Sequence, residues 1–180
     1  MKLVILDRDG VINRDSDRYI KSPAEWQPIP GSIEAIARLH QNGFRIIVAT
    51  NQSGIGRGLF DMATFNAMND KMMEMVFRQG GRIDALFFCP HTDAENCACR
   101  KPKTGMYEEI AARMHVELKG VPFVGDAMRD LQAAEAVGGQ PILVLTGKGK
   151  MTKEKCILPR RTLVFEDLAE ASRHLVAARE

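Results

Sequence analysis

The sequence lacks a long hydrophobic run, a strong net charge and an aromatic-rich segment. None of its apolar runs reaches the roughly 18 residues of a membrane-spanning helix, and the first one meets charge at Asp7, too early for a signal peptide. A net charge of +2 is too small to indicate a nucleic-acid or membrane-surface partner on charge alone. With Trp26 as its one tryptophan, the chain offers no stacking platform for a base or ring. We therefore expect a cytoplasmic monomer that binds neither nucleic acid nor membrane.

Linkers, low-complexity tracts and repeats are also missing, and cysteine is scarce. A chain of 180 residues is long enough for one substantial core and short for two, so we predict a single domain over 1–180. Three of the four cysteines cluster within residues 89–99. In a reducing compartment such a cluster is more typical of metal ligands than of disulfides, and Cys156 is expected to be an ordinary thiol.

Apolar runs rich in Val, Ile, Leu and Phe alternate with segments of helical periodicity. The runs cover 2–6, 44–50, 83–89, 121–125 and 141–146, and the helical segments cover 31–43, 61–81, 105–116 and 129–139. Ser32 is available as a helix cap, and residues 162–180 are expected to form a short strand and a closing helix. The alternation predicts right-handed crossovers and an α/β fold with a doubly wound, mainly parallel sheet.

Polar residues follow each apolar run, where ligands bind in such sheets. Asp7 and Asp9 follow the first run, and their i, i+2 spacing in extended chain directs both carboxylates to one side. The segment TNQSGIGRG (50–58) follows the second and is suited to presenting side-chain and backbone donors to an anion. The third run leads to Arg100, Lys101 and Lys103, and the fourth leads to Asp126 and Asp130.

This set of residues indicates phosphoryl chemistry. Close carboxylates repel one another unless they share a hard cation such as Mg²⁺, which typically joins one or two carboxylates to phosphate oxygens. One aspartate can then attack phosphorus, and a second can protonate the leaving oxygen and activate water. A lysine and a threonine would offset charge on the phosphoryl oxygens. Solvated turn residues explain Asp7 and Asp9 alone, but not acidic and basic residues at four strand ends.

The segment CPHTDAENCACRKPK (89–103) is expected to be an inserted metal-binding loop. Cys89, His91, Cys97 and Cys99 would fill a tetrahedral shell with sulfur and nitrogen ligands, which is typical of a structural zinc site. The alternative is a set of reduced, packed thiols. Zinc would order a long polar loop that presents Arg100 and Lys101.

Four motifs together resemble a known family. DRDG, ATNQSG, RKPK and VGD…D are similar, in order and placement, to the signature motifs of the haloacid dehalogenase (HAD) superfamily of phosphatases, from residue 3 to about residue 147. The resemblance implies that Asp7 is the nucleophile and Asp9 the general acid and base, and that Thr50 and Lys101 stabilise the phosphoryl group. It also implies that Mg²⁺ is held by Asp7, Asp126 and the main-chain carbonyl of Asp9. Asp130 would hold a metal-bound water or support the loop.

The zinc-loop pattern CPH…CxCRKP resembles a small-cap branch of that superfamily whose members act on heptose bisphosphates or histidinol phosphate. TNQSGIGRG, RKPKTGM and LTGKG are closer to the heptose group, whereas the five-residue gap between His91 and Cys97 resembles the histidinol group. The resemblance implies release of the 7-phosphate of a heptose 1,7-bisphosphate in lipopolysaccharide core precursor synthesis, with histidinol phosphate as the alternative. A non-catalytic phospho-ligand binding module is a further alternative, against which the intact Asp7 and Asp9 pair argues.

Candidate contacts to a small sugar phosphate come from three segments. Asp15 and Tyr19 lie just past the first motif, Asn51, Gln52 and Ser53 belong to the second, and Arg100 is expected to hold a second anionic group in bidentate fashion. The lysines at 148, 150, 153 and 155 are expected to form a solvated loop, with contact to a distal phosphate as the less favoured alternative.

Overall fold

Six parallel strands form the centre of the molecule. The computed structural model describes residues 2–178. Its strands are β1 (Lys2–Leu6), β2 (Phe44–Asn51), β3 (Ala85–Cys89), β4 (Pro122–Gly125), β5 (Gln140–Val144) and β6 (Leu163–Phe165). They lie in the order β3-β2-β1-β4-β5-β6, and every pair is parallel. The predicted doubly wound sheet is confirmed.

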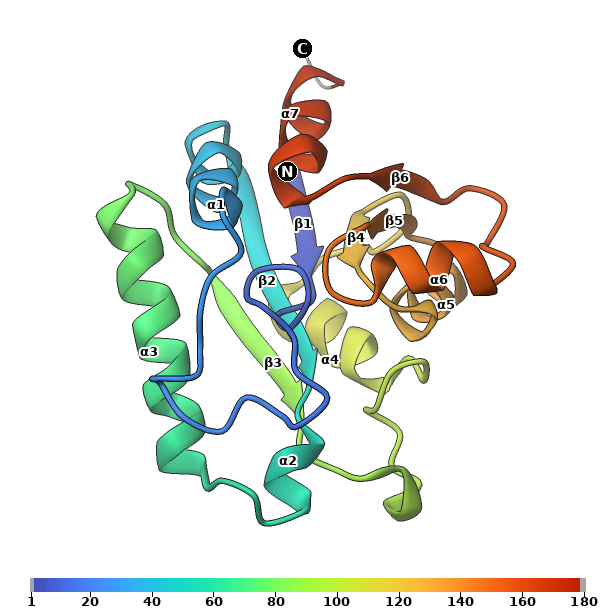
Figure 1. Ribbon diagram of the computed structural model, residues 1–180. Coiled ribbons are helices and arrows are strands. Elements are labelled where there is room, and N and C mark those ends of the chain that lie inside the picture. Colours follow the sequence, from blue (N-terminus) through green and yellow to red (C-terminus); the bar gives the residue numbers. More distant parts are fainter. Residues whose placement is uncertain (1, 179–180) are drawn as a thin grey trace.

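Helices cover both faces of this sheet (Figure 1). They are α1 (Ser32–Gln41), α2 (Ser53–Gly56), α3 (Met62–Arg78), α4 (Gly105–Met114), α5 (Met128–Ala136), α6 (Gly149–Lys155) and α7 (Leu168–Ala177), with a 3₁₀ turn, η1, at Asp93–Glu95. Because side chains alternate along a strand, Val4 and Leu6 pack with α1, α3 and α7 on one face, while Leu3 and Ile5 pack with α4 and α5 on the other. Both faces are therefore buried, which explains the near-continuous apolar runs.

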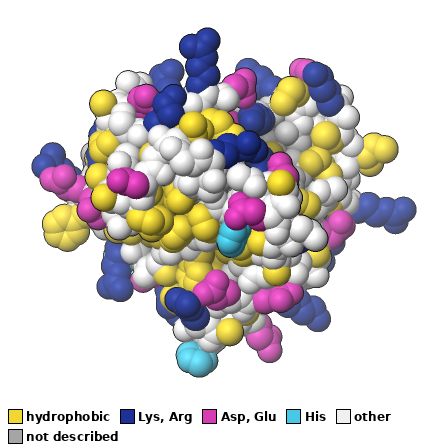
Figure 2. Space-filling model, turned by 90° about the horizontal axis from the view of Figure 1, so that it is seen from below, with side chains coloured by type: hydrophobic (Ala, Val, Ile, Leu, Met, Phe, Trp, Pro, Cys, Tyr) yellow, Lys and Arg dark blue, Asp and Glu magenta, His cyan; other side chains and the backbone are white. Residues whose placement is uncertain are grey.

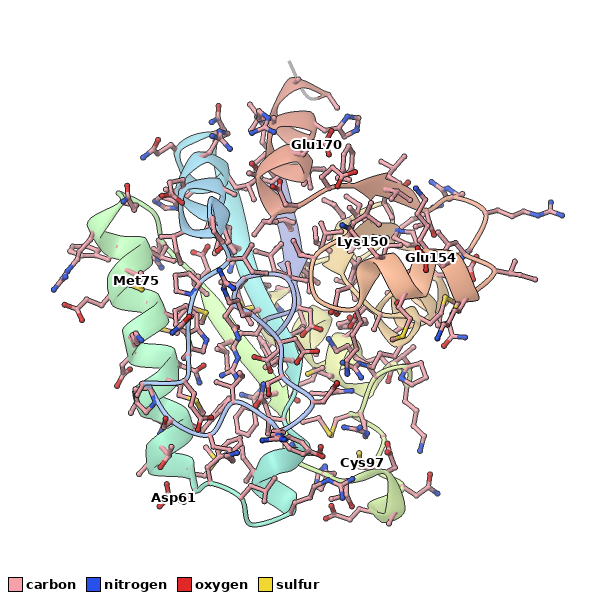
Figure 3. The ribbon with its side chains drawn as sticks, viewed as in Figure 1. Asp61, Met75, Cys97, Lys150, Glu154 and Glu170 are labelled. Carbon is pink, nitrogen blue, oxygen red and sulfur yellow. The ribbon has the colours of Figure 1, made fainter. Side chains whose placement is uncertain are left out.

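The long helices begin largely where the sequence predicts, with one exception. The Asp61 carboxylate accepts a hydrogen bond from Thr64 N at 2.8 Å and caps α3 (Figure 3). Asp167 caps α7 in the same way through Glu170 N at 2.8 Å. The predicted cap at Ser32 is wrong, because its hydroxyl donates to Ile12 O at 2.6 Å and ties α1 to the segment after β1. Residues 179 and 180, at the end of the predicted closing helix, lie outside the described residues.

The lysine-rich segment after β5 is a helix and not the predicted solvated loop. Lys150 and Glu154 lie on this helix, α6 (Figure 3). The Thr152 hydroxyl donates to Asp126 O at 2.9 Å, so α6 is docked against the end of β4. A seven-residue helix is marginal by itself, and this tertiary contact explains why local composition did not reveal it. Within residues 2–178, no helix has the length and hydropathy of a membrane span.

The strand order places a ligand crevice beside β1. The chain adds β2 and β3 on one side of β1 and then crosses to add β4, β5 and β6 on the other, so the strand order reverses between β1 and β4. Figure 2 views the molecule from below, onto the edge where the strands end, and shows Lys, Arg, Asp and Glu side chains scattered over this face. Asp7 follows β1 and Asp126 follows β4 at this edge.

Candidate active site and metal-binding loop

A cavity of about 180 Å³ opens at the carboxyl ends of the strands. Its lining includes these residues predicted from the sequence: Asp7, Asp9, Asp15, Tyr19, Thr50, Asn51, Gln52, Ser53 and Arg100. Two further predicted residues, Lys101 and Asp126, are buried just behind them, at 2% and 1% exposure. The structure thus brings the predicted catalytic and substrate-binding residues to one place.

Lys101 lies between two buried carboxylates. Its Nζ is 3.1 Å from Asp7 Oδ1 and 2.7 Å from Asp130 Oδ1, and it donates to Ala49 O at 2.9 Å. Burial lowers the pKa of Lys101, but Asp130 and Asp7 raise it by more, so its ammonium group stays charged. Asn51 fixes the lysine's backbone, because its side chain accepts from Lys101 N and donates to Lys101 O, both at 3.1 Å.

Asp130 acts as the counter-charge to Lys101. Burial raises the pKa of Asp130, but Lys101 and Arg129 lower it by more, so this carboxyl is ionised. Its Oδ2 also accepts from Ala127 N at 3.1 Å, which fixes the start of α5. Of the two roles that the sequence leaves open for Asp130, loop support matches these contacts.

Asp9 is held by three donors, two of them near it in the sequence and one from the segment after β2. Asn13 Nδ2 donates to its Oδ1 and Gln52 Nε2 to its Oδ2, each at 2.8 Å, and Arg8 NH2 lies 3.0 Å from Oδ1. Arg8 is fully buried, and it also donates to Asn69 Oδ1 on α3 at 3.1 Å. Asp9 itself keeps 21% of its side chain exposed to the cavity. Gln52 also donates to Thr50 Oγ1 at 2.9 Å, so one amide orients two predicted catalytic residues.

Two glycines make room for Asp126. A Cβ on Gly10 would lie 2.0 Å from Asp126 Oδ2, and a Cβ on Gly147 would lie 2.2 Å from the same atom. Both glycines also have positive φ angles of 85° and 54°, which other residues seldom adopt. Asp126 Oδ2 accepts from Lys148 N at 2.8 Å, whereas its Oδ1 is buried and has no hydrogen-bond partner within residues 2–178.

The carboxylates of Asp7 and Asp126, with that of Asp130 close beside them, fit a hard divalent cation. One oxygen from each lies within 4.8 Å of the others. Burial, together with Asp130 and Asp7, raises the pKa of Asp126 to about 8. Burial also raises the pKa of Asp7 to about 6, although Lys101 acts in the opposite direction. A Mg²⁺ ion bound here would give the unpartnered Asp126 oxygen a ligand bond and would offset the repulsion between the carboxylates.

In the metal-free protein, we expect the free energy of unfolding to fall as pH rises from about 4 to about 8. The folded-state pKa values of Asp7, about 6, and Asp126, about 8, exceed the usual 3.8, so the folded protein binds more protons than the unfolded chain in this window. Stability is lost as those protons leave. Because Mg²⁺ replaces them, it should raise Tm by about 5 °C more at pH 8 than at about pH 5.5, measured by thermal unfolding. An equal magnesium effect at both pH values would contradict this assignment.

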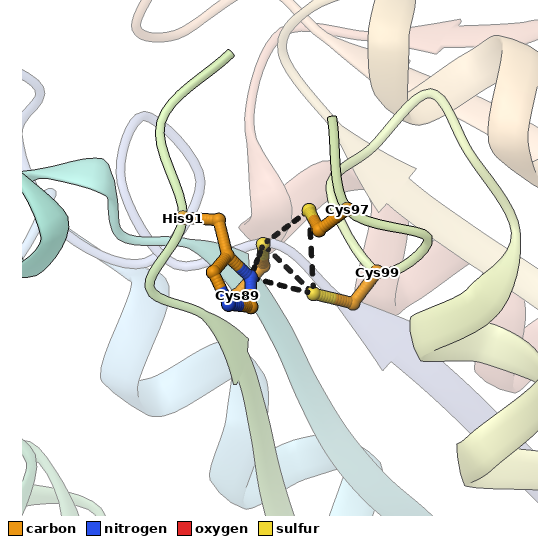
Figure 4. A group of neighbouring side chains, drawn as sticks. All are labelled: Cys89, His91, Cys97 and Cys99. Atoms are coloured by element: carbon orange, nitrogen blue, oxygen red, sulfur yellow. Dashed lines mark hydrogen bonds between the residues drawn. The ribbon is translucent and has the colours of Figure 1, made fainter. Parts of the chain in front are cut away.

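Three thiols and one imidazole converge in the loop after β3 (Figure 4). The sulfur of Cys89 is 3.5 Å from that of Cys97 and 2.9 Å from that of Cys99, and His91 Nδ1 is 3.3 Å from Cys99 Sγ. With zinc–sulfur bonds of about 2.3 Å, tetrahedral ligands lie about 3.8 Å apart, so this cluster is close to that size. All four cysteines of the chain are free thiols. The donor set and spacing are compatible with zinc.

Hydrogen bonding favours the thiolate form of one ligand in this cluster, whereas burial raises the pKa values of the Cys89 and Cys99 thiols. Burial raises the pKa of the Cys97 thiol, but the backbone N–H of Arg100 and the Cys89 and Cys99 thiols lower it by more, to about 7. A thiolate is the form that binds metal. Since Arg100 and Lys101 follow directly, order in the cluster positions both cations at the cavity.

Loss of the proposed zinc should loosen this loop and weaken substrate binding. Cys97→Ser, or removal of the metal by a strong chelator, is expected to raise KM about tenfold or more, because small displacements of binding groups are costly. Hydrogen exchange over residues 89–103 should accelerate in parallel. Cys156→Ser is the matched control, since Cys156 lies outside the cluster. Unchanged KM in protein verified to be zinc-free would show that the metal does not order the loop.

Several residues at the cavity were missed by sequence reasoning. They are Arg8 and Asn13, which hold Asp9, and Arg129, which lines the cavity. Lys148, for which the sequence left a phosphate contact as the less favoured alternative, also lines the cavity, and its Nζ lies 3.6 Å from Asp15 Oδ2 and 3.7 Å from Asp17 Oδ1. Arg8 belongs to the DRDG motif, so the sequence placed it beside the catalytic aspartates. Its buried partner Asn69 is 61 positions away, and local spacing gave no sign of that contact. Of the predicted contacts, Arg100 donates through Nε to Asp93 Oδ1 at 2.5 Å.

Comparison with known proteins gives matches over nearly the whole chain. A family model described as HAD-hydrolase-like matches residues 98–171. The D-glycero-beta-D-manno-heptose-1,7-bisphosphate 7-phosphatases of Bordetella bronchiseptica and Pseudomonas putida are 55% and 54% identical to this chain over 176 residues. Those matches cover 98% of this chain, and 98% and 100% of the two relatives.

Solved structures agree with the fold. The crystal structure of D,D-heptose 1,7-bisphosphate phosphatase from B. bronchiseptica, complexed with magnesium and phosphate, superposes with a TM-score of 0.97 at 54% identity, and the match covers 99% of each chain. The corresponding structure from Burkholderia thailandensis has a TM-score of 0.79 at 50% identity and covers 98% of this chain and 99% of its own.

Proposed function

The chain belongs to the HAD-like hydrolases, within the D-glycero-D-manno-heptose 1,7-bisphosphate 7-phosphatase group, and we propose on this premise that it removes the 7-phosphate of that bisphosphate. The observation that carries the proposal is the placement of Asp7 on the cavity wall, 3.1 Å from a buried, charged Lys101 and two residues from Asp9. A binding module would need neither a nucleophile nor an acid. The similarity favours the heptose bisphosphate over histidinol phosphate.

In the first step, a carboxylate oxygen of Asp7 forms a bond to phosphorus while the bond from phosphorus to the sugar oxygen breaks. Asp9 gives its proton to the departing sugar oxygen, and an aspartyl-phosphate remains on Asp7. In the second step, Asp9 accepts a proton from water as the water oxygen bonds to phosphorus and the bond from phosphorus to the Asp7 oxygen breaks. Phosphate then leaves, and both aspartates return to their starting states.

The surrounding groups stabilise charge during this reaction. Lys101 Nζ and the Thr50 hydroxyl would face the phosphoryl oxygens, and their positions are set by Asp130 and Gln52 respectively. Mg²⁺, held by Asp7, Asp126 and the main-chain carbonyl of Asp9, would neutralise phosphoryl charge when bound. Because Arg8, Asn13 and Gln52 donate to Asp9, the Asp9 side chain is aligned before substrate arrives.

The remaining predicted contacts surround the sugar. Asp15, Tyr19, Asn51, Ser53 and Arg100 line the cavity around Asp7 and would contact the part of the substrate that carries the sugar. The place of the reaction in lipopolysaccharide core precursor synthesis follows from the proposed substrate. The cytoplasmic location, the monomeric state and the single-domain organisation with residues 89–103 as an insertion stay predictions.

Phosphate release by the purified, Mg²⁺-supplied protein tests the assignment. We expect kcat/KM for D-glycero-D-manno-heptose 1,7-bisphosphate, measured with both anomers, to exceed that for histidinol phosphate by several orders of magnitude. The opposite preference would favour the histidinol reaction, and no turnover of either would favour the binding module.

A further inference from the structure

Arg129 is a cation in the active-site cavity to which the proposed mechanism gives no task. It lies in the first turn of α5, one residue before Asp130, and its side chain lines the cavity together with Asp7 and Arg100. The residue is only partly exposed. An arginine in this position is expected to have a counter-charge, because buried guanidinium groups are seldom left unpaired.

No such counter-charge is bonded to it. Within residues 2–178, its guanidinium makes no hydrogen bond or ion pair, and its Nε is buried without an acceptor. The neighbouring carboxylates have other partners, since Asp130 is 2.7 Å from Lys101 Nζ and Asp126 Oδ2 accepts from Lys148 N at 2.8 Å. Arg129 is therefore held in the cavity with its donors unused.

The field at Arg129 keeps it charged. Burial lowers its pKa, but Asp130, Asp7, Asp126 and Asp15 raise it by more. The other cavity cations are engaged, since Arg100 donates to Asp93 at 2.5 Å and Lys148 lies 3.6 Å from Asp15.

We propose that Arg129 binds the phosphate of the substrate that is not transferred, an inference that rests on the proposed bisphosphate reaction. Lys101 and Thr50 serve the phosphoryl group at Asp7, so the second phosphate needs a cation of its own. A guanidinium presents two parallel N–H groups that match two phosphate oxygens, and Arg129 has these donors available. It is then a specificity-determining residue, because it distinguishes a bisphosphate from a monophosphate.

The test compares two substrates that differ by one phosphate. Arg129→Gln and Arg129→Lys are assayed with D-glycero-D-manno-heptose 1,7-bisphosphate and with the matching 7-phosphate, which lacks the 1-phosphate. For the bisphosphate, Arg129→Gln should lower kcat/KM by about 10- to 100-fold, the usual range for a hydrogen bond to a charged group, mainly through KM. For the 7-phosphate, kcat/KM should stay within about threefold. Arg129→Lys keeps the charge without the planar fork, so it should restore part of the loss.

Arg113→Gln is the matched control, because it removes the same charge from an exposed side chain of α4 that pairs with Glu109. It should leave the ratio of the two kcat/KM values unchanged. If Arg129 only balances the charge of Asp7 and Asp126, both substrates will lose activity equally and the proposal is overturned. No loss with either substrate also overturns it. Wild-type protein that does not prefer the bisphosphate to histidinol phosphate would instead refute the proposed function itself.

Discussion

Asp7→Asn is expected to reduce kcat by at least about 10⁴-fold, because it removes the nucleophile that forms the covalent intermediate. The side chain keeps its shape, and Lys101 keeps its ion pair with Asp130 at 2.7 Å. Burial raises the pKa of Asp7 to about 6, so the ionised carboxylate is a source of repulsion in the folded protein. The variant should therefore fold as well as the wild type and still bind inorganic phosphate.

Steady-state kinetics and a phosphate titration of the same sample check this expectation. Asp70→Asn is the control, since Asp70 is an exposed residue of α3 and makes the same change of charge. Loss of activity with retained phosphate binding separates a chemical role from a structural one. If the activity of Asp7→Asn is close to that of the wild type, Asp7 is not the nucleophile.

Lys101→Met should impair both stability and turnover. It leaves Asp7 and Asp130 buried at 5% and 3% exposure without their shared cation. Breaking a buried ion pair from one side costs about 3–5 kcal/mol, and in a protein of this size each kcal/mol lowers Tm by about 2–4 °C. The loss of charge at the phosphoryl group should lower kcat by about 10²–10³-fold.

The pH dependence identifies the cause of the instability. Without Lys101, the pKa values of Asp7 and Asp130 rise, and protonation of these carboxyls relieves the repulsion at low pH. The deficit in Tm relative to the wild type should then be larger at about pH 8 than at about pH 5. Lys119→Met, in an exposed loop, is the control. A deficit in Tm that does not vary with pH would indicate lost packing and not lost charge.

Much of the candidate site was predictable because it lies at strand ends. The apolar run at 2–6 ends at Leu6 in both sequence and structure, so the edge position of Asp7 followed from local periodicity. Cys89, the last residue of β3, and Asp126, the residue after β4, were placed in the same way. Parallel strands bring their carboxyl ends to one edge, which joins residues that are far apart in the chain. The resemblance of the motifs then supplied their roles.

The errors arose where a residue's partner is distant. Ser32 is a residue type that often caps helices, but its hydroxyl donates a hydrogen bond to Ile12 O, 20 positions away in the chain. The lysine-rich stretch 148–155 has the composition of a loop, but Thr152 docks it on Asp126 O as α6. In each case a tertiary hydrogen bond outweighs a weak local preference.

The sequence by itself determined the strand-helix alternation, the catalytic motifs and the four candidate zinc ligands, because each depends on residue types at short, regular spacing. Only the tertiary structure decided which charges pair. It placed Lys101 between Asp7 and Asp130, set three donors on Asp9, and left Arg129 in the cavity without a partner. Charge pairing depends on distances across the sheet edge and on burial, which spacing along the chain does not specify.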